Sequence, residues 1–261
     1  MITKEKKARR IAVISGKGGV GKTVITANLA GALSSLGRRI LVIDADLGLA
    51  NLDILLGLDP KLTIQDALHG KHTVEEVLMA TNQGFDLLPA GSGVPEGAVM
   101  TPAMAEKMDL FLAPLETKYD AILFDVGAGI GDVVLLFANL AHDIILVVTP
   151  EPTSLMDAYA SIKILNQSYM RSEFLLVVNQ ANPKNYDQVG RTVATHLQNI
   201  SSRFLESASP VQIKLIGSIP QDPAIPNSIR HRQLLASISP QAPATRLLNN
   251  LARVIDTTSL S

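Results

Sequence analysis

The sequence has no cysteine among its 261 residues. Disulfides, thiolate metal sites and cysteine nucleophiles are therefore excluded. This excludes proteins that hold an iron–sulfur cluster through cysteine and enzymes that attack glutamine with a cysteine. It is compatible with a reducing compartment, and we expect a cytoplasmic protein.

Net charge and long hydrophobic runs are also lacking. The 23 basic and 24 acidic residues give a formal net charge of -1, which argues against nucleic-acid binding over a large surface. No stretch reaches the roughly 18 apolar residues of a membrane-spanning helix. Residues 1–10, MITKEKKARR, form a basic flank without the uninterrupted apolar core of a signal peptide. This flank either stays solvated or touches acidic lipid headgroups or nucleic acid.

Short apolar segments alternate along the chain with longer amphipathic ones. The apolar segments lack a polar face, as expected for strands of a parallel sheet covered by helices. We predict an α/β fold with a single doubly wound, mostly parallel sheet flanked by helices. The predicted strands cover 10–15, 39–46, 85–93, 119–129, 143–150, 173–180 and 214–220. The predicted helices cover 22–36, 102–117, 131–141, 153–168, 186–205 and 242–256.

One loop carries a phosphate-binding motif. Residues 16–23, GKGGVGKT, match G-x-x-x-x-G-K-[ST] between a predicted strand and a predicted helix. Such a loop turns backbone N–H groups toward phosphates at a helix N-terminus. Lys22 would reach the β- and γ-phosphates, and the Thr23 hydroxyl would ligate Mg²⁺. The alternative is a glycine-rich turn without a ligand. The predicted nucleotide-binding residues of this segment are Gly16, Lys17, Gly18, Gly19, Val20, Gly21, Lys22, Thr23 and Val24.

Three aspartates lie toward the carboxyl ends of predicted strands, where ligands of open α/β sheets bind. Asp125 ends an apolar run and would hold magnesium from a neighbouring strand. Asp44 and Asp46 are two residues apart, so they share a side of an extended chain. One would support the metal through water, and the other would orient an attacking water. Because carboxylates repel a triphosphate without a cation, the pattern predicts ATP with Mg²⁺, held by Thr23, Asp44 and Asp125.

The loop has a second lysine, Lys17, and KGGVGKT resembles the deviant phosphate loop of the MinD/ParA ATPases. Residues 44–58, DADLGLANLDILLGL, are most similar to the flagellar-number regulators of the FlhG/FleN branch. LLPAGSG, DVGAGI and VVNQ resemble that branch too. The resemblance runs from about residue 10 to about 235 and implies a P-loop NTPase fold of the SIMIBI type.

The resemblance also implies roles for individual residues. Lys17 would reach across an ATP-bound homodimer to the partner's nucleotide. Asp46 would position the attacking water, and Asp125 would contact magnesium through water. Asn179 would read the adenine edge, as an amide can by donating and accepting at once. The base pocket would be completed by Pro220 and Asp222.

The C-terminal segment has two interpretations. Residues 11–241 are predicted to form the ATPase domain, and 242–261 a helix and tail. The apolar residues of this helix fall on one face: Leu247, Leu248, Leu251, Val254 and Ile255. The helix either packs on the sheet as part of the same domain or binds the inner face of the membrane weakly, because it has few basic residues and no aromatic residue.

The resemblance implies an ATP-dependent dimerising ATPase that regulates flagella. Its partners would be a flagellar GTPase of the FlhF type, or a transcription or basal-body protein; we do not expect DNA. The FlhF-activating motif DQAxxLR of that branch is absent from the N-terminal residues. The alternatives are an ATPase for the division site or for chromosome or plasmid partitioning, and a metabolic P-loop synthase.

Overall fold

The computed structural model describes residues 7–46, 51–90, 102–205 and 210–258, without the side chains of 102–105 and 258. Its centre is one eight-stranded sheet in the order β3-β4-β2-β5-β1-β6-β7-β8. All neighbouring strands are parallel except β3 and β4. The strands are β1 (Arg9–Ser15), β2 (Ile40–Ala45), β3 (Met79–Ala80), β4 (Asp86–Leu88), β5 (Ala121–Ala128), β6 (Asp143–Val148), β7 (Glu173–Ala181) and β8 (Gln212–Pro220). The predicted fold class is confirmed.

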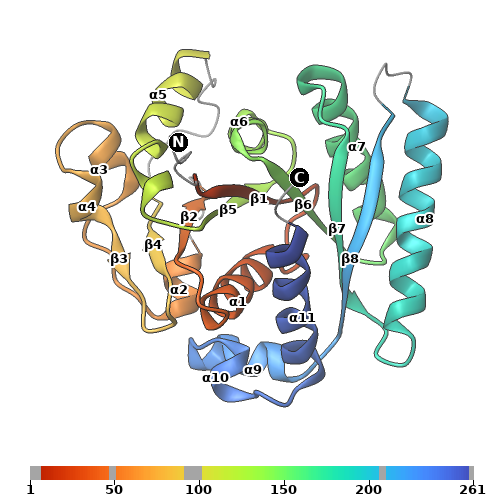
Figure 1. The fold of residues 1–261 in the computed structure, drawn as a ribbon. Coiled ribbons are helices and arrows are strands. Elements are labelled where there is room, and N and C mark those ends of the chain that lie inside the picture. Colours follow the sequence, from red (N-terminus) through yellow and green to blue (C-terminus); the bar gives the residue numbers. More distant parts are fainter. Residues whose placement is uncertain (1–6, 47–50, 91–101, 206–209, 259–261) are drawn as a thin grey trace, which may run out of the picture.

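Helices cover both faces of the sheet, with α6 above it and α1 and α11 below it in Figure 1. The lower face carries α1 (Lys22–Ser35), α2 (Leu52–Leu56), α9 (Ala224–His231), α10 (Leu235–Ile238) and α11 (Pro243–Thr258). The other face carries α3 (Ile64–Leu68), α4 (Val74–Val77), α5 (Pro102–Leu112), α6 (Asp132–Leu140), α7 (Pro152–Tyr169) and α8 (Tyr186–Phe204). The central strands β2, β5, β1 and β6 are therefore buried over most of their length, because two hydrophobic layers enclose the sheet.

Two of the predicted elements are wrong in extent. The helix predicted over 102–117 ends at Leu112, and a separate 3₁₀ turn, η1 (Leu115–Thr117), follows. Pro114 lies between them; it has no N–H to donate, and it disfavours helical backbone in the residue before it. The strand predicted over 85–93 is shorter in the structure, where β4 covers only Asp86–Leu88. Residues 91–93 lie outside the described residues.

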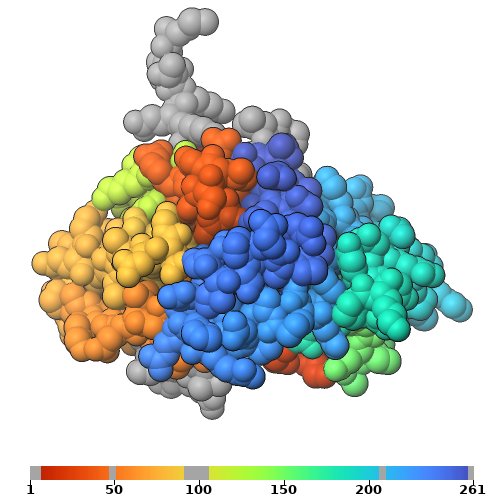
Figure 2. All heavy atoms as spheres, turned by 90° about the horizontal axis from the view of Figure 1, so that it is seen from below, coloured from red at the N-terminus to blue at the C-terminus, as the bar shows by residue number. Residues whose placement is uncertain are grey.

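Most of the apolar face of α11 is buried against the lower layer of the domain, with Leu247 and Val254 half-buried. Leu248, Leu251 and Ile255 are each at most 2% exposed, and α11 packs on α1 and β8. Figure 2 shows the outer surface of α9, α10 and α11 in blue on this face of the molecule. None of the helices in the described ranges is both long and apolar enough to cross a membrane.

Candidate functional site

The phosphate-binding motif forms the turn between β1 and α1. Gly21 is the residue before α1 and has a left-handed backbone, with φ +88°, which an L side chain rarely adopts. A Cβ at Gly21 would also lie 2.4 Å from Asn179 Nδ2. Only glycine therefore fits at this position, and the N–H groups at the start of α1 remain open to an anion.

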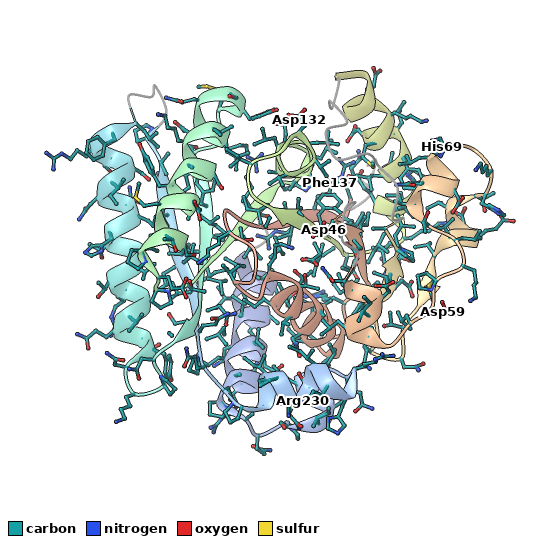
Figure 3. The ribbon with its side chains drawn as sticks, turned by 180° about the vertical axis from the view of Figure 1, so that it is seen from behind. Asp46, Asp59, His69, Asp132, Phe137 and Arg230 are labelled. Carbon is teal, nitrogen blue, oxygen red and sulfur yellow. The ribbon has the colours of Figure 1, made fainter. Side chains whose placement is uncertain are left out.

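A cavity of about 680 Å³ opens over this turn, a volume in the range of small-molecule and cofactor sites. It brings together the loop, the end of β2, and residues of α2 and α9. Among the described residues it is lined by Ser15, Gly18, Gly19, Val20, Gly21, Lys22, Thr23, Val24, Asp46, Asn51, Ile54, Leu55, Ala128, Ile229 and Arg232. Figure 3 labels Asp46, which lies near the centre of the molecule.

Two consecutive amide side chains at the end of β7 donate hydrogen bonds to backbone carbonyls of the phosphate-binding loop. Asn179 Nδ2 donates to the carbonyl of Val20 at 2.7 Å, and Gln180 Nε2 donates to that of Gly19 at 3.2 Å. Asn179 is 5% exposed, and its Oδ1 has no hydrogen-bond partner among the described residues. A buried unpartnered acceptor is costly. Asn179 is not among the residues that line the cavity, and its contact with an adenine stays a prediction.

The loop lysine has a buried acidic partner. Lys22 Nζ lies 3.1 Å from Asp125 Oδ1, with side chains 8% and 2% exposed. Thr26 Oγ1, one turn further along α1, donates to the same oxygen at 3.0 Å. The sequence did not identify Thr26, because only the packing of α1 on β5 brings it to Asp125.

Two of the three aspartates lie opposite each other in the sheet. Asp44 of β2 pairs in register with Asp125 of β5. Burial, followed by repulsion from Asp125, raises the pKa of Asp44 from 3.8 to about 7. Asp44 accepts hydrogen bonds from the N–H groups of Asp46 at 3.1 Å and Leu52 at 3.3 Å. Asp44 therefore ties the segment that carries Asp46 to the start of α2.

Lys17 lies outside the set of residues that line the cavity. Its Nζ donates to Glu151 Oε2 at 2.7 Å and to Thr153 Oγ1 at 3.2 Å, both at the start of α7. The two charged side chains are 39% and 61% exposed. Glu151 was not identified from the sequence, since nothing in its local pattern marks it as a partner of Lys17.

The residues predicted for the base pocket have structural partners of their own. Pro220 is buried beside Ala181 of β7. The carboxylate of Asp222 accepts from the N–H groups of Ala224 and Ala244, at 2.9 and 3.0 Å, and so joins the starts of α9 and α11. Neither residue is among those that line the cavity, and their contact with a base stays a prediction.

The family model that matches the chain is that of ParA, described as NUBPL iron-transfer P-loop NTPase, and it matches residues 6–256. The chain has no cysteine with which to hold iron. Among curated proteins, the chain is similar to the antiactivator FleN of Pseudomonas aeruginosa. The two are 37% identical over 246 residues, 94% of this chain and 85% of the relative. It is also similar to the flagellum site-determining protein YlxH of Helicobacter pylori, with 33% identity over 94% of this chain and 81% of the relative.

The fold is similar to that of the septum site-determining protein MinD of Pyrococcus horikoshii, solved as a complex with Mg-ADP. The TM-score is 0.74 at 26% sequence identity, over 95% of this chain and 96% of the other. The residues that line the cavity fit the phosphates of such a ligand, because a glycine-rich turn and a helix N-terminus meet there.

Proposed function

The chain belongs to the MinD/ParA family of P-loop NTPases, and we propose that it is a magnesium-dependent ATPase that dimerises on ATP and regulates the number or placement of flagella. The observation that carries this proposal is the different placement of the two loop lysines. Lys22 is buried beside Asp125, whereas the side chain of Lys17 is 39% exposed and lies outside the cavity lining. The exposure of Lys17 supports a role toward a second subunit, once its contacts with Glu151 and Thr153 are exchanged.

Magnesium and ATP would be held by residues of the loop and of the two central strands. Thr23, Asp44 and Asp125 would bind the ion, directly or through water, and the ion would neutralise the phosphate oxygens. When the nucleotide enters, Lys22 would exchange part of its contact with Asp125 for phosphate oxygens. Asp46 would orient the attacking water, since its side chain lines the cavity beside the loop.

Nucleotide binding in this mechanism produces a signal rather than a chemical product. ATP would bring two chains together through Lys17, and hydrolysis would remove the contact, so that a partner is bound and released. The partner we propose is a flagellar GTPase of the FlhF type, or a transcription or basal-body protein. The similarity to FleN and YlxH supports the flagellar role.

We place the protein in the cytoplasm, with contact to the inner face of the membrane as a second property of the dimer. Leu248, Leu251 and Ile255 on the apolar face of α11 are buried and not available for such a contact in this structure, whereas Leu247 and Val254 are half-buried. The basic flank is the other candidate, and most of it lies outside the described residues.

A second candidate function is the positioning of the division site. The similarity to MinD, over nearly the whole of both chains, favours it. The two candidates predict different consequences when the gene is removed.

The experiment deletes the gene in its source bacterium and counts flagella and misplaced septa by electron microscopy. We expect an altered number or placement of flagella with normal division, restored by the wild-type gene but not by Lys22→Ala. Normal flagella together with misplaced septa would overturn the flagellar role in favour of the second candidate. A deletion with neither change would overturn both.

A further inference from the structure

Arg232 ends α9 in a backbone conformation that favours glycine. Its φ is +53° and its ψ +43°, and a side chain on the backbone is strained in this left-handed region. Glycine is the usual residue at such a helix end. Backbone strain of this kind persists where the surrounding structure or a function requires the side chain. The position therefore raises the question of what the arginine side chain does.

The stem of Arg232 lies against the end of α2. Gly57, which ends α2, has φ +67°, and a Cβ built there would lie 3.3 Å from both Cβ and Cδ of Arg232. The absence of a side chain at Gly57 thus lets the arginine pass close to the α2 backbone. From there Arg232 lines the same cavity as Thr23 and Val24 of the phosphate loop.

The guanidinium of Arg232 has no partner within the ranges that the structure describes. No ion pair and no side-chain hydrogen bond is formed by it there, whereas Lys22 is committed to Asp125 and Lys17 to Glu151. Of these three cations, Arg232 is thus the one that remains available to an anion in the cavity. Because Arg232 ends α9 and its stem lies against the end of α2, an anion bound by its guanidinium would affect the positions of both helices.

We propose that Arg232 is a nucleotide-binding residue whose guanidinium contacts the phosphate groups in the cavity and draws α2 and α9 onto the bound nucleotide. The proposal rests on the proposed function to the extent that this cavity binds a nucleotide. A guanidinium has paired donors that match two phosphate oxygens and keeps its charge at any physiological pH. Because α2 follows the segment that carries Asp46, the same contact would help to position Asp46, the residue proposed to orient the attacking water.

The experiment measures the affinity for Mg-ADP by calorimetry, at low and at high salt. The test variant is Arg232→Gly, because glycine suits the left-handed backbone and removes only the side chain. The matched control is Arg230→Ala, on the same helix but outside the cavity lining, at the outer edge of the molecule in Figure 3. Arg232→Lys tests whether charge alone suffices.

We expect Arg232→Gly to weaken Mg-ADP binding about 10- to 100-fold and to reduce its dependence on salt. The nucleotide-free variant should unfold at the same temperature as the wild type or higher, because glycine relieves the backbone strain. Arg232→Lys should recover part of the affinity, and Arg230→Ala should bind as the wild type does.

Equal affinities for Arg232→Gly and Arg230→Ala would overturn the proposal. Weaker binding with an unchanged salt dependence would also overturn it, because the contact would then not be with phosphate. If the wild type itself does not bind Mg-ADP, the proposed function fails first, so the two failures are distinguishable.

Discussion

Lys17 and Glu151 form an ion pair within one chain, with Nζ 2.7 Å from Oε2. The lysine that the family resemblance assigns to the partner's nucleotide is therefore held on its own subunit. Glu151 is the residue before α7, and Thr153 of that helix accepts a second hydrogen bond. Dimerisation through Lys17 requires these contacts to be exchanged for contacts to phosphate.

Glu151→Gln should make dimerisation easier. The substitution removes the charge that holds Lys17 and leaves the amide able to accept a hydrogen bond. Because both side chains are substantially exposed, we expect no more than about a fivefold fall in the ATP concentration needed for half-maximal dimerisation. Light scattering during an ATP titration measures this, with Glu173→Gln as an exposed control. A higher ATP requirement would contradict the holding role of Glu151.

Asp46→Ala should slow hydrolysis without preventing ATP binding. Its carboxylate lines the cavity and lies near Gly127 at the end of β5, where it would orient a water molecule. We expect phosphate release to fall at least about 100-fold and the ATP-bound dimer to persist correspondingly longer. Asp59→Asn, a highly exposed aspartate outside the cavity lining, is the control. Phosphate release at the wild-type rate from Asp46→Ala would refute this role.

Asp44 should make the nucleotide-free protein less stable as pH rises. Its pKa is about 7 in the folded chain, against 3.8 for the unfolded group. The folded state therefore binds more protons between these values, and the free energy of unfolding falls as pH increases through that window. A pKa difference of this size sets an upper limit of about 4 kcal/mol on the loss.

Asp44→Asn removes this titration. Urea unfolding of the magnesium-free protein at about pH 5 and about pH 8 should show a smaller difference for the variant than for the wild type. An identical pH dependence in the two proteins would show that Asp44 does not titrate in this range.

The sheet and its long helices could be predicted because their patterns are strong and local. Segments such as 143–150 are apolar on both faces, and the helices predicted over 22–36 and 153–168 agree with α1 and α7 to within one residue at each end. The short elements α2, α3, α4, α9, α10 and β3 were not predicted. Each has at most eight residues, so its stability depends on packing rather than on its own periodicity.

The positions of the candidate site residues could be predicted where these residues are neighbours in the sequence, whereas their roles stay predictions. The loop of residues 16–23 and the aspartates at strand ends follow from spacing. The contacts of Thr26 with Asp125, and of Lys17 with Glu151, join residues about a hundred or more positions apart, so they depend on strand order. The left-handed backbone of Arg232 has no sequence signal, because the residue itself disfavours it.

The C-terminal helix illustrates a limit of pattern reading. An apolar stripe suits a lipid surface and a protein core equally well. In the structure Leu251 lies 3.4 Å from the position that a Cβ on Gly217 of β8 would take. In this structure the buried residues of the stripe pack in the hydrophobic core. A role of the helix at a membrane stays a prediction.

Leu251→Ala should destabilise the domain. The residue is 1% exposed, and deleting a buried leucine side chain costs about 2–5 kcal/mol. Chemical denaturation measures the loss, and Arg253→Ala on the exposed face of α11 should change stability by less than about 0.5 kcal/mol. An unchanged stability for Leu251→Ala would mean that α11 is not packed in solution as it is in this structure.

The most direct test of the account is the mass of the protein in solution with a non-hydrolysable ATP analogue and Mg²⁺, measured by size-exclusion chromatography with light scattering. The wild type should be a dimer with the analogue and a monomer with ADP. Lys17→Ala should remain a monomer in both while binding the analogue with nearly wild-type affinity in calorimetry. A Lys17→Ala dimer with the analogue, or a wild type that stays monomeric, would contradict the claim that Lys17 converts ATP binding into association of two chains.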